Sequence, residues 1–331
     1  MKKVLNLFLL LLLLWLGWQF AGWALFRAVW QPDATACRAA SGACWGFIVE
    51  KHRLIAFGTY PYEEHWRPAL SSVLLVALWV LSAWRVFWKP RLIFIWVVGL
   101  ATIGVLMWGG VFGLPYVENE RWGGLILTLL LTTFGLAFAF PLSILLALGR
   151  RSELPTVRAL CVAYIELIRG VPLVSVLFMA SVMLPLFLPA GVSVDKLLRA
   201  QIALILFAAA YLAEVVRGGL QAIAQHQYDT ADALGLNYLQ RTFLIVLPQA
   251  LRIAVPPLVN TCIGFFKDTS LVLIIGLFDL LSTIKVSLND PAWTGFGVEA
   301  YLFAAAVYFI FCYSMSLYSR RLEASAGRYG G

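Results

Sequence analysis

The polar stretch Tyr228-Asp229-Thr230-Ala231-Asp232-Ala233-Leu234-Gly235, followed after twelve residues by Pro248, lies between two strongly apolar segments. It decides the fold because a polar insert between membrane-crossing segments must lie at a membrane face or have a function. We predict two short helices here. Asp229 or Asp232 can serve the first turn of the first helix, and Gly235 suits the left-handed position after its end.

The second of these helices has its own start and stop signals. Asn237 with Gln240 three residues later predicts a capping box. The helix should run from Tyr238 to about Leu247, because Pro248 disfavours α geometry in the residue before it. A surface hairpin without function and a functional insert are both open from this geometry alone.

The composition is that of a membrane protein. Hydrophobic residues make up 62% of the 331 residues, and the mean hydropathy is +0.86. Charged residues are 13% of the chain, about half of the usual share in soluble domains. The sequence therefore predicts an all-α, polytopic membrane protein.

About eight transmembrane helices are expected, since a crossing needs about 20 apolar residues. Their predicted ranges are 4–26, 69–88, 92–113, 124–148, 171–188, 202–216, 258–281 and 301–318. The first is interpreted as an uncleaved anchor, because its apolar stretch is longer than the roughly 7–15 residues of a secretory signal. Cleavage after Ala36 is the alternative.

The basic residues indicate the orientation. With the N-terminus inside, most of the 25 lysine and arginine residues fall in segments facing the cytoplasm, as the positive-inside rule requires. Both termini are then cytoplasmic. The net charge of +8 is interpreted as a topology signal and not as a nucleic-acid-binding surface.

The chain divides near residue 116. Residues 1–115 form a three-helix membrane region with an outer loop at 31–68. Residues 116–321 form a five-helix core with a cytoplasmic loop at 217–256, and residues 322–331 form a cytoplasmic tail. No inverted repeat of the kind common in secondary transporters is found.

The outer loop contains Cys37 and Cys44. The loop would face an oxidising compartment, so a disulfide between them is a hypothesis. Its aromatic residues suggest either a belt at the membrane interface or a small folded cap, and we favour the belt. These residues are Trp45, Phe47, Tyr60, Tyr62 and Trp66.

Catalytic and metal-binding signatures are missing from the sequence. It contains no phosphate-binding G-x-x-x-x-G-K-[ST] loop, so we do not expect this chain to bind ATP. None of the three histidines has a partner at ligand spacing, so no metal site is expected. The chain is predicted not to be an enzyme, and its energy source must be a gradient or another chain.

Three polar clusters remain. Glu166 and Arg169 precede the fifth predicted span, Glu214 closes the sixth, and Lys267-Asp268-Thr269-Ser270 interrupts the seventh. Ionisable groups at membrane depth are costly and usually pair with each other or line a pathway. Lys267 and Asp268 are therefore either a neutralised structural pair or part of a pathway.

The loop from residue 227 to 260 resembles the cytoplasmic loop of ABC importer permeases, with the pattern E-A-A-x-x-x-G-x9-I-x-L-P. The chain departs from it in having Asp-Thr-Ala for Glu-Ala-Ala, although the acidic first position is kept. The matching residues are Asp229, Thr230, Ala231, Gly235, Ile245, Leu247 and Pro248.

Other motifs extend the resemblance over about residues 124–321. Arg169-Gly170-Val171-Pro172-Leu173, residues 214–219 and Lys267-Asp268-Thr269-Ser270-Leu271 are similar to the polar amino acid branch of these permeases. Gly42-Ala43-Cys44-Trp45 in the outer loop, with the extra N-terminal spans, resembles the general L-amino acid permease subgroup.

This resemblance implies a type I importer permease core in a bacterial inner membrane. It implies a second permease subunit, usually a different chain, two ATP-binding subunits that hold ATP and Mg, and a periplasmic amino acid-binding protein. The loop would couple to the ATPase and drive alternating access. Its implied coupling residues are Asp229, Thr230, Ala231, Asp232, Gly235 and Pro248.

The implied substrate is an amino acid, and no residue in the spans identifies which one. The candidates for lining the pathway are Lys267, Asp268, Thr269, Ser270, Glu166, Arg169 and Glu214. The competing hypothesis is a secondary transporter of small polar solutes, driven by an ion gradient. It would require proton- or sodium-linked carboxylates within the spans.

Overall fold

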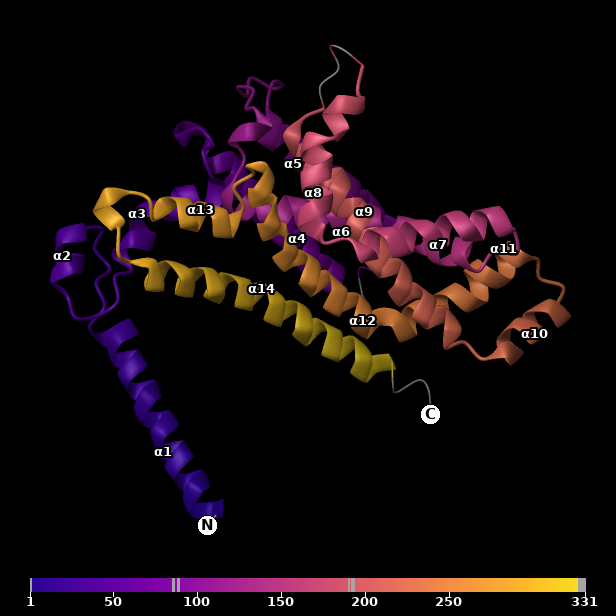
Figure 1. The fold of residues 1–331 in the computed structure, drawn as a ribbon, viewed down its shortest axis with the longest axis horizontal. Helices are drawn as coiled ribbons and strands as arrows, with labels where there is room; N and C mark the ends of the chain where they lie inside the picture. The colour runs from indigo at the N-terminus through magenta and orange to yellow at the C-terminus, as the bar shows by residue number, and fades with distance from the viewer. Residues whose placement is uncertain (1, 85–86, 88–89, 190, 192–193, 327–331) are drawn as a thin grey trace.

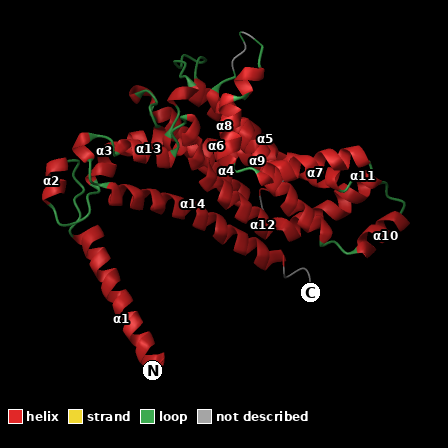
Figure 2. Cartoon of the chain, viewed as in Figure 1, coloured by secondary structure: helices red, strands yellow, loops and turns green. Residues whose placement is uncertain are grey.

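The computed structural model describes residues 2–326 except 85–86, 88–89, 190 and 192–193. Within these residues the protein is built from helices joined by loops and turns, without named strands (Figure 2). Residues 327–331 of the predicted tail and part of the end of the second predicted span lie outside the described residues.

The helices follow the chain in the order shown in Figure 1. They are α1 Lys2–Ala21, α2 Ala34–Ala39, α3 Gly46–Phe57, α4 Trp66–Ala83, α5 Pro90–Trp108, α6 Gly124–Arg150, α7 Pro155–Gly170, α8 Leu173–Val182, α9 Lys196–Gln221, α10 Gln225–Ala233, α11 Tyr238–Gln240, α12 Leu247–Asp268, α13 Leu280–Ser287 and α14 Gly297–Ala326.

Among the described residues, seven helices are long and apolar enough to cross a membrane, or up to eight if one bent pair counts as a span. This confirms the predicted all-α membrane fold. The fifth predicted span, 171–188, is wrong as a single helix. It contains α8, which joins α7 at a bend of 103°, and a 3₁₀ helix over Leu184–Phe187. Val171 and Pro172 lie between the two helices, where proline and its predecessor disfavour continuous α geometry.

The boundaries of several other predicted spans also differ from the observed helices, most clearly those of the sixth and the seventh. The sixth extends to Lys196–Gln221, because Asp195 caps its start by accepting bonds from two backbone N–H groups. The seventh begins earlier, at Leu247, and changes to a 3₁₀ helix over Thr269–Ile275. Gly276 then adopts a left-handed φ of 74°, which ends that helix before the predicted boundary at residue 281.

The core forms around α6 and α9. Leu127 and Leu131 on α6 pack with Leu204, Ala209 and Leu212 on α9, and all five are buried. Small side chains let helix backbones approach closely where there is no water to drive association. α12 packs against both α9 and α14. α9 is the central helix of the core, because α6, α7, α8 and α12 all pack against it.

The N-terminal region joins this core through α4 and α5. Leu75 on α4 and Met107 on α5 are buried with Ile126 and Leu129 of α6. In contrast, α1 projects away from the other helices (Figure 1). Its described side chains are exposed along almost the whole helix, so its apolar surface is available to lipid or to another subunit.

The outer loop folds as a cap, and the favoured prediction of an aromatic belt is wrong for part of it. Phe47 and Tyr60 are buried, whereas Tyr62 and Trp66 are exposed. Phe47 lies against Trp293 with 5.8 Å between ring centroids. The belt prediction failed because it considered the loop alone, without the 290–296 segment that covers it.

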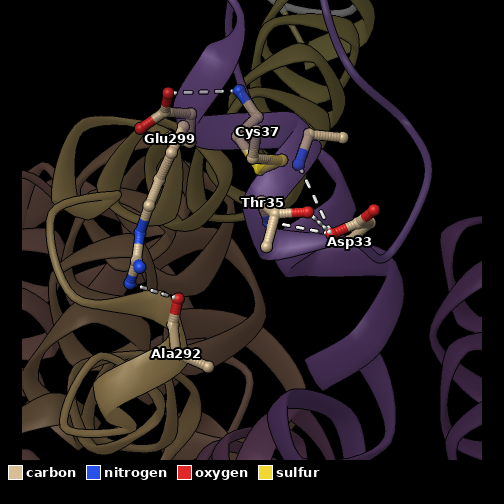
Figure 3. The surroundings of a disulfide bond; sticks show 8 residues. Asp33, Thr35, Cys37, Ala292 and Glu299 are labelled. Atoms are coloured by element: carbon tan, nitrogen blue, oxygen red, sulfur yellow. Dashed lines mark hydrogen bonds between the residues drawn. A yellow bond between two sulfur atoms is a disulfide. The ribbon is translucent and has the colours of Figure 1, made fainter.

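A disulfide joins Cys37 and Cys44 within this cap, with 5.4 Å between their Cα atoms (Figure 3). Asp33 caps α2 by accepting a bond from the Thr35 N–H at 2.8 Å. Bonds from the Thr35 hydroxyl and backbone also lower the pKa of Asp33. Arg38 on α2 donates to the carbonyl oxygens of Pro291 and Ala292, which fastens the cap to the core.

Candidate functional site

The first helix of the polar loop at 217–256 is α10, and it begins earlier than predicted. Its N-cap is Ala224, whose side chain makes no capping bond. Asp229 and Asp232 therefore lie in the middle and the last turn, so the prediction that one of them serves the first turn is wrong. Asp229 instead accepts a bond from the Gln225 side chain at 3.0 Å.

α10 ends as predicted at Gly235, which has a φ of 74°. The Gly235 N–H donates to the Asp232 carbonyl at 2.9 Å, and the Leu236 N–H donates to the Ala231 carbonyl at 3.2 Å. This pair of bonds is a Schellman motif, which satisfies the last carbonyls of a helix and requires a left-handed residue. The turn therefore redirects the chain sharply.

The second helix begins with the predicted capping box. Asn237 accepts from the Gln240 N–H at 2.9 Å, and Gln240 accepts from the Asn237 N–H at 3.0 Å. The predicted end at Leu247 is wrong. The chain passes through a π-helical turn over Arg241–Val246 into α12. Pro248 lies in the first turn of α12, where a missing N–H costs nothing.

An ion pair holds the two parts of the loop together. Arg241 lies 2.6 Å from the Asp232 carboxylate. On α10, Tyr228 and Ala231 face inward, while Asp229 and Thr230 are exposed. α10 therefore presents polar side chains on its exposed side.

A cluster of charged residues lies toward the C-terminal ends of α6, α7 and α9. Glu214 on α9 is its centre, with a side chain only 15% exposed. It binds Arg150 at 2.6 Å and Arg217 at 2.8 Å, and lies 3.6 Å from Arg169. Arg150 also binds Glu166 at 2.9 Å.

The structure therefore brings together Glu166, Arg169 and Glu214, three of the residues predicted to line a pathway. Both carboxylates form ion pairs with arginines, so this cluster joins α6, α7 and α9. Sequence reasoning missed Arg150 because 64 positions separate it from Glu214. Two consecutive arginines at the end of an apolar helix were the available signal.

The other predicted pathway residues lie elsewhere, where α12 becomes 3₁₀. Lys267 is exposed, Asp268 and Ser270 are half-buried and Thr269 is buried. No ion pair among the described residues includes Lys267 or Asp268. The two side chains are therefore not in direct ion-pair contact, and both interpretations of this pair stay predictions. Lys267 continues an exposed face of α12 that also carries Ile253, Pro257 and Asn260.

A family model for the inner membrane component of binding-protein-dependent transport systems matches residues 139–327. This is more than half of the chain and contains the loop and the charged cluster. The chain belongs to this family. It is thus a membrane component of a transport system and not an enzyme, and the family assignment does not favour a gradient-driven secondary transporter.

Similar proteins support the assignment to this family of inner membrane components. The inner membrane amino-acid ABC transporter permease protein YhdY of Escherichia coli is 49% identical, over 94% of this chain and 86% of that protein. The glutamate/glutamine/aspartate/asparagine transport system permease protein BztC of Rhodobacter capsulatus is 38% identical, over 98% and 90%.

A solved structure supports the fold of this family member. The crystal structure of an amino acid ABC transporter with histidines superposes with a TM-score of 0.53 at 29% identity. The match covers 60% of this chain and 92% of that one. The part of the chain that this structure does not cover is matched by the two relatives above, which align over nearly the whole chain.

Proposed function

We propose that this chain is the membrane-spanning subunit of an ATP-driven importer that carries amino acids from the periplasm to the cytoplasm. The observation that carries the proposal is the short α10 with its Schellman turn at Gly235, which keeps the spacing of the coupling-loop pattern although Asp-Thr-Ala replaces Glu-Ala-Ala. The names of the relatives supply the amino acid class.

In this proposal, the exposed surface of α10 binds a separate ATPase subunit. Asp229 and Thr230 are presented there on a short helix whose C-terminal end is fixed by the Schellman turn. A short rigid helix can transmit the displacement of its partner to the membrane helices instead of absorbing it. The ATPase dimer would hold ATP and Mg, and alternating access would follow from its opening and closing.

The remaining partners are a second permease subunit, usually a different chain, and a periplasmic amino acid-binding protein. The exposed face of α12 with Asn260 and Lys267 is the proposed pathway surface, since polar groups at membrane depth are tolerated where they line a polar pathway or meet a partner. This arrangement requires the loop 217–256 and both termini to be cytoplasmic, and the cap formed from 31–68 to be periplasmic.

The test is ATPase binding and uptake by the assembled complex. Asp229→Lys reverses a charge on the exposed face of α10, so the chain should lose most of the ATPase subunit that co-purifies with it. Glu63→Lys makes the same change at an exposed carboxylate of the outer loop, and should retain the ATPase.

Uptake is measured in proteoliposomes with glutamate, glutamine, aspartate and asparagine as probes. The proposal predicts that uptake requires ATP and the binding protein. Uptake driven by a proton or sodium gradient without ATP would support the secondary-transporter alternative and overturn the proposal.

A further inference from the structure

Tyr228 is the residue through which α10 reaches the membrane helices. Its hydroxyl donates to the Leu220 carbonyl at the end of α9, at 3.3 Å. The same hydroxyl accepts a bond from Arg151 Nη1 at 3.1 Å. Arg151 also donates to the Leu220 carbonyl at 3.1 Å, so three polar groups from α6, α9 and α10 meet at one point.

The ring of Tyr228 lies near two guanidinium groups. Arg151 lies 5.6 Å and Arg241 lies 5.7 Å from the ring centroid, within the range of cation–π attraction. Arg241 binds Asp232 on the same helix. Tyr228, on one arm of the loop, therefore contacts Arg241 on the other arm and Arg151 at the end of α6.

Arg151 is adjacent to Arg150, which connects this point to the charged cluster. Arg150 is the last residue of α6 and Arg151 its C-cap. Arg150 binds Glu214 at 2.6 Å and Glu166 at 2.9 Å. Because the two arginines are consecutive in the chain, a shift of the backbone at the end of α6 would displace both sets of contacts, which gives a contiguous route from Tyr228 to Glu166.

Glu166 lies in the last turns of α7, directly before the 103° bend into α8. Arg169, one turn later, lies 3.6 Å from Glu214 and 5.5 Å from the Tyr211 ring centroid. The partly buried setting of Glu214 limits the screening of these charges by salt. The orientation of α7 at its bend therefore depends on the same cluster that Arg150 reaches.

We propose that Tyr228 and Arg151 are positioning residues that transmit the movement of α10 through Arg150 and Glu214 to the bend between α7 and α8. The proposal rests on the function proposed above. A contiguous set of contacts is not by itself a demonstration of coupling, so the test must measure coupling directly. Helix anchoring alone would lower folding, ATP hydrolysis and uptake together.

The experiment uses the complete transporter in proteoliposomes and measures amino acid taken up per ATP hydrolysed, with the same four amino acids. Tyr228→Phe keeps the ring and removes the hydroxyl, and Arg151→Gln removes the guanidinium. Each removes two of the three hydrogen bonds described above and should lower the ratio about fivefold or more, since losing a single hydrogen bond corresponds to about fivefold. ATPase retention and the hydrolysis rate should stay within about twofold of the original protein.

The double variant and a control make the result specific. Residues that act in one contact chain are non-additive, so the double variant should have the same ratio as either single variant. Tyr313→Phe removes an exposed hydroxyl on α14 and should leave the ratio unchanged. A normal ratio in Tyr228→Phe, or a parallel loss of hydrolysis and uptake, would overturn the proposal.

The same measurements separate this proposal from the one on which it rests. If the unaltered chain retains no ATPase subunit, the proposed function fails. If the unaltered chain couples uptake to hydrolysis while Tyr228→Phe couples equally well, only the transmission through Tyr228 fails.

Discussion

Glu299 accepts a hydrogen bond from the backbone N–H of Cys44, with 3.1 Å between Oε1 and N. The bond joins residues 255 positions apart and fixes the outer cap to the core. Glu299 is buried and lies in the first turn of α14, where the helix dipole favours a carboxylate. The cap is thus fastened to the start of the last helix.

Removing this acceptor should destabilise the cap. Glu299→Ala leaves the buried Cys44 N–H without a partner, which costs about 1–3 kcal/mol. Glu299→Gln keeps an acceptor oxygen of the same reach and should lose much less. The measurement is thermal unfolding of the purified chain in detergent. Equal midpoints for both variants would contradict the role of the hydrogen bond.

The disulfide should stabilise the same cap independently. Cys37 and Cys44 are seven positions apart, and closing a loop of this size contributes about 2–3 kcal/mol in the chain-entropy account. Cys37→Ser with Cys44→Ser should therefore make the 34–57 segment more sensitive to protease. Cys161→Ser, at a free cysteine, is the control, and equal digestion rates would exclude the expected effect.

Local signals in the sequence predicted the loop better than they predicted long-range contacts. The Asn237–Gln240 box and the turn at Gly235 depend on residues within five positions of each other, and the structure confirms both. The predicted start of α10 was wrong because two acidic residues offered plausible N-caps. The helix instead begins at Gln225, and its N-cap Ala224 makes no side-chain capping bond.

The charged cluster shows why contacts between distant helices could not be predicted from the sequence. Glu166 and Glu214 were recognised as unusual charges, but their shared partner Arg150 is brought close only by the packing of α6 with α7 and α9. The same limit applies to Phe47, whose burial depends on Trp293, almost 250 positions away. Periodicity predicts which segments are helices and does not predict which ends meet.

The attachment of α3 to the core should weaken in acid. Lys51 Nζ lies 2.6 Å from Asp290 Oδ2, and this hydrogen bond holds the pKa of Asp290 below its ordinary value of 3.8. A carboxyl with a lowered pKa stabilises the folded state above its unfolded pKa, and this contribution is lost as the pH falls through the folded value.

Hydrogen exchange in α3 should therefore accelerate below about pH 4. Asp290→Asn removes the titrating group, so exchange in α3 should be faster at neutral pH and should change less on acidification. Glu63→Gln, at an exposed carboxylate of the same outer region, is the control. An unchanged acid response in Asp290→Asn would show that another group is responsible.

The turn at Gly235 gives the sharpest test of the loop as a rigid lever. Gly235 has a φ of 74° and open space around its Cα, so a substitution there acts through backbone strain and not through a clash. Gly235→Val forces a β-branched residue into the left-handed region at about 1–2 kcal/mol, which is about 5- to 30-fold in a conformational equilibrium. Uptake per ATP should fall accordingly, while ATP hydrolysis continues.

Gly235→Asn is the matched control, because asparagine tolerates this conformation, and it should keep most of the coupling. If Gly235→Val transports with an unchanged ratio, the sharp turn does not transmit the movement of the ATPase.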